Sequence, residues 1–428
     1  MTKIWSRQSK YERWLEVEVA ICKAYAAQGT IPAADLEAIV AHGSFTLERC
    51  DEIELETRHD LMAFVRCVSE TVTAKADRTP SPSRWIHFGV TSYDVIDTAL
   101  GMMMRDSCVV LQASVSNLIG AIDNLEREHG HHPCIGRTHG IHAEPITFGH
   151  KLEGWREEFK RHQERLAYCQ QEIGVGKVSG AVGIHAHVDR RLEAHICEDL
   201  GLKADPSSTQ IIARDRHAFV LGELAVLAGS LERIATELRN LQRTEILEVQ
   251  EQFAKGQTGS SAMPHKRNPW NSETVCGLAR LVRGNAHAML ESVMTWHERD
   301  LTNSSLERIV FPDTFQVVDF MVNRVASILQ GLVVMPEDMA KNLRIMGDLV
   351  FREHVMVALI GAGLSREAAY KVAQRNAAKA WEGEDFRTSV SQDPDVQANL
   401  SPEQVNELFS LLHHLRNAPN SERLVDNI

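Results

Sequence analysis

The stretch VLGELAVLAGSLERIATELRNL (residues 220–241) decides the fold of this chain. Its apolar residues recur at alternating steps of four and three residues, which is the seam of a helix with a narrow apolar stripe. Such a helix must bury its stripe against other helices. The segment 216–252 contains no proline and is predicted to be one long helix. The seam comprises Val220, Leu224, Leu227, Leu231, Ile234, Leu238 and Leu241.

Further helices of the same kind accompany it. Residues 104–125 and 318–332 carry two more seams, and residues 146–173 and 272–296 have a helical period with wider apolar faces. Long helices bury such stripes most economically in one bundle. Independent coiled coils are less favoured, because short connectors with Gly and Pro separate the segments. The sequence therefore predicts an all-α fold. It has no convincing strand alternation, and VGIHAHV (182–188) fits either a loop or a strand.

Interruptions of the pattern divide the chain into three predicted domains. RTPSPSRW (78–85) follows a first helical region, and Val334-Met335-Pro336 ends the long helices. We predict an N-terminal helical domain at 1–88, a central bundle domain at 89–335 and a small C-terminal helical domain at 336–428. Two helix starts are also marked, because Ser9-Lys10-Tyr11-Glu12 fits a capping box and Ser401-Pro402-Glu403-Gln404 fits an N-cap with proline at the first helical position.

Composition excludes several classes of protein. The formal net charge of the 428 residues is -12, which argues against binding of a nucleic-acid backbone but permits a local basic pocket for a small anion. The eight cysteines are scattered without a C-x-x-C pair, so reduced core thiols are expected. The N-terminus has no apolar signal-peptide core, and no apolar run reaches the roughly 20 residues of a membrane helix. We expect a cytoplasmic protein with no membrane partner.

Five polar stretches interrupt the apolar periodicity. They are ETRHD (56–60), GVTSYDVIDT (89–98), GRTHGIHAEPITFG (136–149), GSSAMPHKRNP (259–269) and HERDLTNSSLER (297–308). Each alone has an ordinary structural explanation; Thr91 or Ser92, for example, could cap the helix that follows. Together they place hydroxyls, amides, histidines and arginines on loops between long helices. Arginine with Ser or Thr suits phosphate and carboxylate groups, and histidine suits acid catalysis.

A metal site is the weaker interpretation of the histidines. HGHHP (129–133) groups three of them, and His139 and His142 follow. The chain has no H-E-x-x-H motif and no cysteine pair at zinc spacing. Histidine is common where a long helix ends, near the negative end of its dipole. Helix capping is therefore the better interpretation, and no metal is expected.

The stretch GSSAMPHKRNP resembles the signature loop of the fumarase/aspartase superfamily, G-S-S-x-M-P-x-K-x-N, at all seven fixed positions. The resemblance implies a helical three-domain fold around a long central bundle. It also implies a homotetramer in which each active site is built from three chains. The seams described above favour the same bundle independently.

The other polar stretches indicate the branch of this superfamily. GRTHGIHAEP, TRHD, TSYDVIDTAL and HERDLTNSSLERIVFPD together resemble the adenylosuccinate lyase family. That family releases fumarate from adenylosuccinate, giving AMP, and from the succinylated aminoimidazole carboxamide ribotide of purine synthesis (SAICAR). Carboxymuconate cycloisomerases have a similar loop but generally lack the T-H-G-x-H-A-E-P histidine. The remaining alternatives are another fumarate-releasing or cycloisomerase member, or a helical scaffold without catalysis.

The resemblance implies a role for individual residues. Ser260 corresponds to the general base that removes the succinyl Cβ proton, and His139 to the general acid that protonates the leaving nitrogen. Glu273 is expected to orient His139, and His59 to assist the acid or position substrate. Among the implied substrate-binding residues, Lys266 and Asn268 would hold the succinyl carboxylates. Arg299, Ser304 and Arg308 would bind the nucleotide phosphate. The full set is Arg58, Asp60, Thr91, Ser92, Thr138, Gln210, Lys266, Asn268, Arg299, Ser304 and Arg308.

These residue types suit an elimination. The reaction passes through a carbanion whose charge spreads into a carboxylate, and a fixed cation such as Lys266 stabilises that charge. Serine acts as a base only in a desolvated site, which a closing loop supplies. No metal or redox cofactor is required.

One segment and two positions depart from the family pattern. An Arg-Tyr arm that commonly precedes Ile4-Trp5 and contacts the phosphate is not included in this sequence, so weaker phosphate affinity is expected. Tyr93 replaces a small residue, and Asn271 stands where glycine is common.

Overall fold

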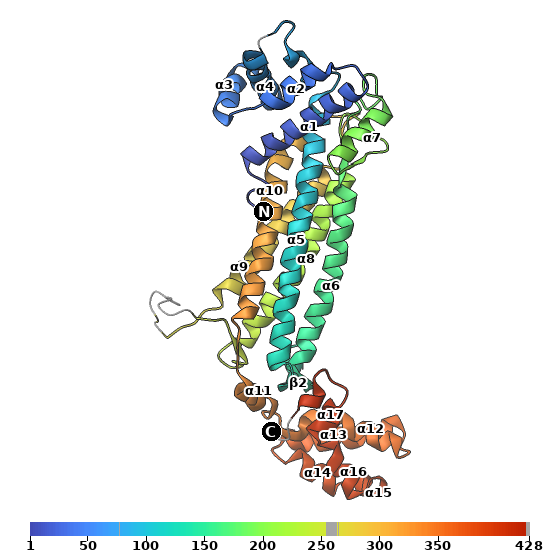
Figure 1. Cartoon of the computed structure of the whole chain (residues 1–428). Helices are drawn as coiled ribbons and strands as arrows, with labels where there is room; N and C mark the ends of the chain where they lie inside the picture. The colour runs from blue at the N-terminus through green and yellow to red at the C-terminus, as the bar shows by residue number, and fades with distance from the viewer. Residues whose placement is uncertain (77, 254–262, 264, 425–428) are drawn as a thin grey trace. The chain divides into compact units, whose positions relative to one another are not determined.

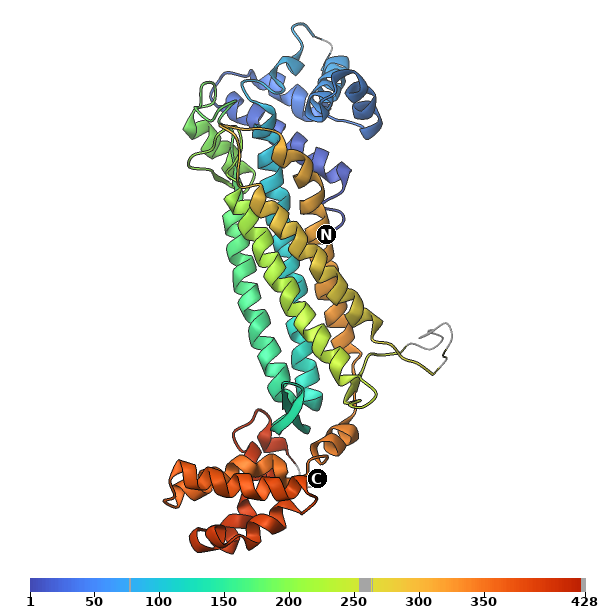
Figure 2. The ribbon, with the colours of Figure 1, turned by 180° about the vertical axis from the view of Figure 1, so that it is seen from behind.

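The computed structural model describes residues 1–76, 78–253, 263 and 265–424. Helices make up 68% of the fold, which confirms the predicted helical class. Figures 1 and 2 show five long helices whose segments lie side by side. They are α5 (Ser92–His129), α6 (Phe148–Ile173), α8 (Asp215–Leu241), α9 (Trp270–Glu291) and α10 (Thr302–Gln330).

The predicted seams are the buried faces of these helices. Met104, Leu111 and Val115 of α5 are fully buried, as are Val220 and Leu224 of α8. By length and composition α5 is apolar enough to cross a membrane, but these buried side chains make it a core helix of the bundle. All eight cysteines are buried and free, as the sequence predicted.

The chain divides into two compact units. Unit 1 comprises Met1–Ser116, Arg161–Leu231 and Gly277–Asn323, and unit 2 comprises Asn117–Lys160, Glu232–Cys276 and Arg324–Ile428. This division cuts across the long helices, so each unit contains segments of all five. The boundaries 1–88, 89–335 and 336–428 therefore stay a prediction.

Unit 1 adds shorter helices to its segments of the bundle. Its core joins Trp14 and Ile21 to Phe64, Cys67 and Val95. Trp14 and Phe64 meet edge to face with ring centroids 5.6 Å apart, an arrangement that aromatic quadrupoles favour. The added elements are α1 (Arg7–Ala27), α2 (Ala33–His42), α3 (Leu47–Thr57), α4 (Asp60–Ala76), η1 (Pro82–Trp85), α7 (Arg190–Asp199) and the parallel pair β3 (Val175–Gly176) and β4 (Lys203–Ala204).

Unit 2 contains a β-hairpin that the sequence analysis missed. Strands β1 (Pro133–Thr138) and β2 (Ile141–Thr147) pair antiparallel, with an irregularity between Ile135 and Arg137. A second antiparallel pair joins β5 (Val249–Gln250) to β6 (Val333–Val334). The helices that follow are α11 (Pro336–Leu343), η2 (Gly347–Phe351), α12 (Arg352–Gly361), α13 (Arg366–Trp381), α14 (Phe386–Gln392), α15 (Pro394–Asn399), α16 (Pro402–Leu408), α17 (Leu411–Leu415) and η3 (Ser421–Arg423).

The helix caps correct one prediction and confirm another. Ser6, and not Ser9, caps α1, because its side chain accepts the Ser9 backbone N–H, and residues 9–12 lie inside the helix. The capping box at Ser401 and Gln404 is present in both directions. The stretch 182–188 is a loop.

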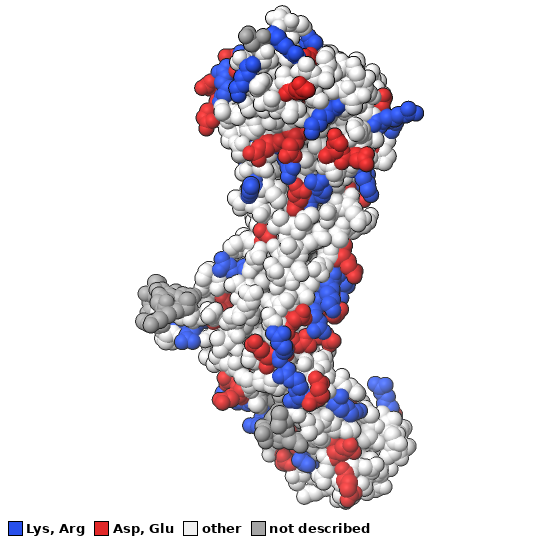
Figure 3. Space-filling view, viewed as in Figure 1, with Lys and Arg blue, Asp and Glu red and all other residues white. Residues whose placement is uncertain are grey.

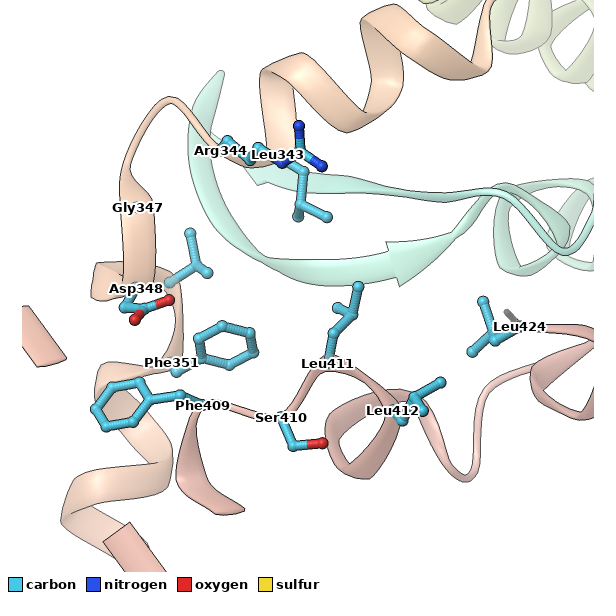
Figure 4. A pocket seen from close by; sticks show the side chains of 11 residues that line it. Leu343, Arg344, Gly347, Asp348, Phe351, Phe409, Ser410, Leu411, Leu412 and Leu424 are labelled. Carbon is cyan, nitrogen blue, oxygen red and sulfur yellow. The ribbon is translucent and has the colours of Figure 1, made fainter. Parts of the chain in front are cut away.

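Two surface features bear on where a ligand could bind. Figure 3 shows acidic and basic side chains interspersed on the visible face, with no extended basic surface there. Figure 4 shows a cavity of about 370 Å³ in unit 2, between η2 and the chain around α17. It is lined by Phe351, Phe409 and Leu411 together with Asp348, whose pKa burial raises. None of the predicted site residues lines this cavity.

Candidate active site

The turn before α5 brings Ser92 next to His59. Asp94 accepts the Thr91 backbone N–H at 2.8 Å, which fixes the start of the helix. Ser92 Oγ then lies 3.4 Å from His59 Nε2. The other ring nitrogen, Nδ1, accepts the Met62 backbone N–H at 3.4 Å. The predicted residues Thr91, Ser92 and His59 are thus neighbours.

His59 lies at a sharp bend between two helices. The preceding residue, Arg58, adopts φ 54° and donates its N–H to the Glu54 carbonyl, which ends α3. Left-handed backbone is costly for a residue with a side chain and is concentrated at functional sites. Asp60 opens α4 directly afterwards. The bend therefore presents the side chains of Arg58 and His59 to solvent, where both are exposed.

Asp60 is shared by two cations. Arg308 Nη2 donates to Asp60 Oδ2 at 2.9 Å, and Lys10 Nζ lies 3.7 Å from the same oxygen. Burial raises the pKa of Asp60, but the charges of Lys10 and Arg308 outweigh it and leave the pKa below its usual value. Burial lowers the pKa of Lys10 more than Asp60 raises it. The carboxylate thus holds two positive charges close together.

These groups border a cavity of about 460 Å³ in unit 1. The charged part of its lining comprises three cations and three carboxylates, namely Arg7, Lys10, Arg308, Glu54, Asp60 and Glu307. Ser304 of α10 supplies a hydroxyl, and Tyr93 of α5 an aromatic ring. The volume and the mixture of apolar and polar walls are those of a small-molecule site.

Gln210 and Arg299 meet beside this cavity. Arg299 Nη1 donates to Gln210 Oε1 at 2.9 Å, and Gln210 Nε2 donates to the Ala181 carbonyl at 2.9 Å. The backbone N–H of Gln210 also donates to the Glu298 carbonyl at 3.3 Å. Two segments far apart in the sequence are thereby joined at the positions that the sequence analysis singled out.

A buried ion triad supports this arrangement. Arg214 donates to Asp97 on α5 at 2.8 Å and to Glu307 on α10 at 2.7 Å, and its side chain is fully buried. Burial raises the pKa of Asp97, but the charge and hydrogen bonds of Arg214 lower it further, so the net shift is downward. The triad fixes α5, α10 and the segment before α8 relative to one another within unit 1.

The hairpin of unit 2 carries Thr138 and His139. His139 (φ 54°) and Gly140 (φ 79°) form its two-residue turn. Two positive φ values match the twist of the flanking strands, and Asn-Gly is the usual choice for such a turn. Both Thr138 and His139 are exposed at the tip. Below them, Arg137 donates to Glu248 at 2.6 Å, which anchors the strand.

The remaining predicted residues flank the start of α9. Ser260 lies outside the described residues. Lys266 is exposed and donates its backbone N–H to the Met263 carbonyl at 3.0 Å, and Asn268 is half-buried. Glu273 lies exposed in the first turn of α9. Glu251 caps this helix, because its carboxylate accepts the backbone N–H groups of residues 271 and 272.

The described residues therefore fall into two groups. Unit 1 brings together His59, Asp60, Ser92, Ser304 and Arg308, with Gln210 and Arg299 alongside. Unit 2 holds Thr138, His139, Lys266, Asn268 and Glu273. No group of three His, Cys, Asp or Glu side chains in the described part of the chain is arranged to hold a metal ion.

Sequence reasoning missed the residues that support the cavity. Lys10 was hidden in the apparent capping box at Ser9, although a lysine beside two aromatic residues, Tyr11 and Trp14, is a signal for cation–π contact. Its Nζ lies 4.5 Å from the Trp14 ring centroid. Arg214 gave no signal, because its partners Asp97 and Glu307 are distant in the sequence.

Comparison with known proteins shows the family to which the chain belongs. A family model described as "Lyase" matches residues 1–284, and one described as "Adenylosuccinate lyase C-terminus" matches residues 348–423. The adenylosuccinate lyase of Synechocystis sp. is 47% identical over 97% of this chain and 96% of its own length. That of Bacillus subtilis is 44% identical over 97% and 95%.

Solved structures share the fold. A fumarate lyase from Mesorhizobium sp. BNC1 superposes with a TM-score of 0.86 at 27% identity, covering 99% of this chain and 96% of its own. A 3-carboxy-cis,cis-muconate lactonizing enzyme from Pseudomonas putida gives 0.85 at 27% identity, with 98% and 96% covered. The two adenylosuccinate lyases are thus more similar to this chain in sequence than these two solved structures are.

Proposed function

Because the chain belongs to the adenylosuccinate lyase family, and so is a lyase of purine biosynthesis, we propose that its two groups of polar residues divide one elimination between them. The group in unit 1 binds the nucleotide part of the substrate. The group in unit 2, together with Ser260, carries out the proton transfers and holds the succinyl carboxylates. The substrates are adenylosuccinate and SAICAR, which share the succinylamino group and a ribose phosphate.

The cavity in unit 1 is the observation that carries this proposal. Arg308, Lys10 and Ser304 line it and can supply two cations and a hydroxyl to an anion, in a lining that also includes Arg7 and the carboxylates Glu54, Asp60 and Glu307. A phosphate group is matched by charge-assisted hydrogen bonds of this kind. The positive charges are already concentrated there by Asp60, so a bound phosphate would replace or share an existing anionic partner.

The second group fits the acid and the carboxylate-binding functions. Ser260 removes the proton from the succinyl Cβ, and the C–N bond then breaks. His139 protonates the departing nitrogen, and Glu273 orients its ring. Lys266 and Asn268 stabilise the charge that develops on the carboxylate before the bond breaks. The left-handed turn at His139 supports this role, because it projects the imidazole from the tip of a hairpin.

We also propose that the protein is a homotetramer whose active sites combine residues from different chains. Unit 1 leaves large apolar side chains exposed on the long helices, including Phe219 (47%), Leu281 (46%) and Ile309 (61%). Exposed apolar side chains on neighbouring helices support burial against further helices.

Turnover tests the reaction. The purified protein should convert adenylosuccinate to AMP and fumarate, followed by ultraviolet absorbance, and should also release fumarate from SAICAR. Ser260→Ala should lower kcat strongly while substrate still binds. A folded protein that turns over neither substrate would refute the proposed reaction, and a near-normal kcat in Ser260→Ala would remove Ser260 as the base.

Mixing two inactive variants tests the sharing of sites. Ser260→Ala and His139→Asn are each expected to be inactive as pure oligomers. After dissociation and reassembly together, mixed oligomers should regain a fraction of the wild-type rate, because some sites receive both intact residues. Sedimentation should give a tetramer. No recovery from verified mixed tetramers would contradict the sharing of these two residues between chains.

A further inference from the structure

Tyr93 lies directly beneath Arg299. The guanidinium carbon of Arg299 is 3.8 Å from the centroid of the Tyr93 ring. Tyr93 is only 5% exposed and also lines the 460 Å³ cavity. Burial raises the pKa of Tyr93, so its phenol is neutral and the contact is between a cation and the face of an uncharged ring. A cation over an aromatic face is attracted by the ring quadrupole.

The contact with the Tyr93 ring does not occupy the in-plane N–H groups of Arg299. A guanidinium group donates in its own plane, whereas stacking uses its face, so the ring does not compete with an anion. Gln210 accepts from Nη1. Among the residues that the structure describes, Nε is buried and has no hydrogen-bond partner. Nε and Nη2 together form the side of the guanidinium that can bind an anion through two parallel hydrogen bonds.

We propose that Tyr93 is a positioning residue that holds Arg299 with its Nε–Nη2 edge toward the phosphate of the bound nucleotide. The inference rests on the proposed function, in which Arg299 binds that phosphate. Tyr93 acts by restricting the rotamers of a long side chain, which otherwise lose entropy on binding. It stands at a position where the family commonly has a small residue, so this is a feature of the present chain.

Substitution of Tyr93 should separate binding from catalysis. Tyr93→Leu keeps an apolar side chain but removes the ring, and the KM for adenylosuccinate should rise about 5- to 10-fold with kcat within about 2-fold. Tyr93→Phe keeps the ring and should rescue most of the lost affinity. Tyr93→Ser, with a small side chain like that of the family, provides a second variant without the ring.

Inhibition by products distinguishes positioning from a general loss of packing. Inhibition by AMP should weaken about 5- to 10-fold in Tyr93→Leu, whereas inhibition by adenosine, which lacks the phosphate, should not change. Phe159→Leu, at a buried ring of α6 in unit 2, is the matched control for packing. Equal weakening for AMP and adenosine, or unaltered AMP inhibition in both Tyr93→Leu and Tyr93→Ser, would overturn the proposal.

A double-mutant cycle tests whether Tyr93 acts through Arg299. Tyr93→Leu combined with Arg299→Gln should bind AMP no more weakly than Arg299→Gln alone. Fully additive losses would overturn the proposal. The cycle measures AMP binding directly, so it remains decisive whether or not the wild-type protein turns over adenylosuccinate. Failure of the proposed reaction is recognised separately by the absence of turnover.

Discussion

Acidification should destabilise the protein through His217, a 1% exposed residue in the first turn of α8. Burial, assisted by the neighbouring charge of Arg214, lowers the pKa of His217 to about 3. Its Nδ1 has no partner among the described residues, and its ring packs on Phe311 with centroids 5.5 Å apart. The folded protein therefore keeps the imidazole neutral, whereas the unfolded chain protonates it near pH 6.5.

The sign and size of the effect follow from proton linkage. The folded-state pKa lies below the unfolded value, so the stabilisation is complete above pH 6.5 and declines as the pH falls toward 3. At pH 5 the protonated form of an unfolded histidine exceeds its neutral form about 30-fold. In the folded protein His217 is almost entirely neutral at this pH. This difference costs about 2 kcal/mol of unfolding free energy relative to pH 7.5.

Denaturant unfolding of the wild type and of His217→Gln at two pH values measures this loss of stability. His217→Gln does not titrate, and its amide can donate to the Ala213 carbonyl as the ring does. The unfolding free energy of wild type should fall between pH 7.5 and 5.0 by about 2 kcal/mol more than that of His217→Gln, since other titrating groups affect both equally. His195→Gln, at an exposed histidine of α7, controls for loss of an imidazole. Parallel free energies for wild type and His217→Gln would refute the reasoning.

Three other substitutions follow from single contacts. His139→Asn retains a residue that tolerates the left-handed turn, so kcat should fall at least about 100-fold in a fumarate-release assay; a matching loss of thermal stability would contradict this. Lys177→Met removes the cation paired with fully buried Asp94. The unfolding free energy measured in urea should fall by about 3–5 kcal/mol. A fall of less than about 1 kcal/mol would contradict a stabilising role for this ion pair. Arg308→Gln should raise the Kd for AMP about 10-fold in calorimetry. The melting temperature should change little, because the arginine side of the Arg308–Asp60 ion pair is exposed. Unchanged AMP affinity would remove Arg308 from the proposed phosphate site.

The bundle was predictable because a narrow apolar stripe leaves a long helix one way to be buried. The seam of α8 was placed correctly, but its end was not. The expected helix extended to 252, whereas α8 ends at Leu241. Leu247 adopts φ 49° and Val249 enters the pairing with β6. Pairing with a strand more than 80 residues later leaves no local signal in the sequence.

The hairpin was missed because its alternation is broken. Cys134 and Ile135 are consecutive and both buried, and the pairing shifts between Ile135 and Arg137. A bulge of this kind moves successive side chains off the regular two-residue period. The turn itself was visible only as T-H-G, since histidine replaces the asparagine or aspartate that usually marks such a turn. The residue predicted to be the general acid, His139, therefore concealed the signal of the turn.

Three of the stretches expected as loops lie largely in regular elements, because 136–147 forms most of β1 and β2, and residues from 92 and from 302 onward belong to α5 and α10. The sequence also could not show what joins these segments. Two groups of buried ion pairs on α5 join segments that are distant in the sequence. Asp94 pairs with Lys177, and Asp97, three residues later, pairs with Arg214 and through it with Glu307. Proteins in which apolar side chains replace a buried ion pair are often as stable as the original. A gain in stability therefore does not by itself explain why this chain has these ion pairs. We infer that their function is to fix register: an apolar contact tolerates sliding, whereas a bidentate arginine does not. Because the same turn of α5 carries Ser92 and Tyr93, and α10 carries Arg308 next to Glu307, we infer that this fixed register determines whether the side chains proposed to bind phosphate converge on the cavity.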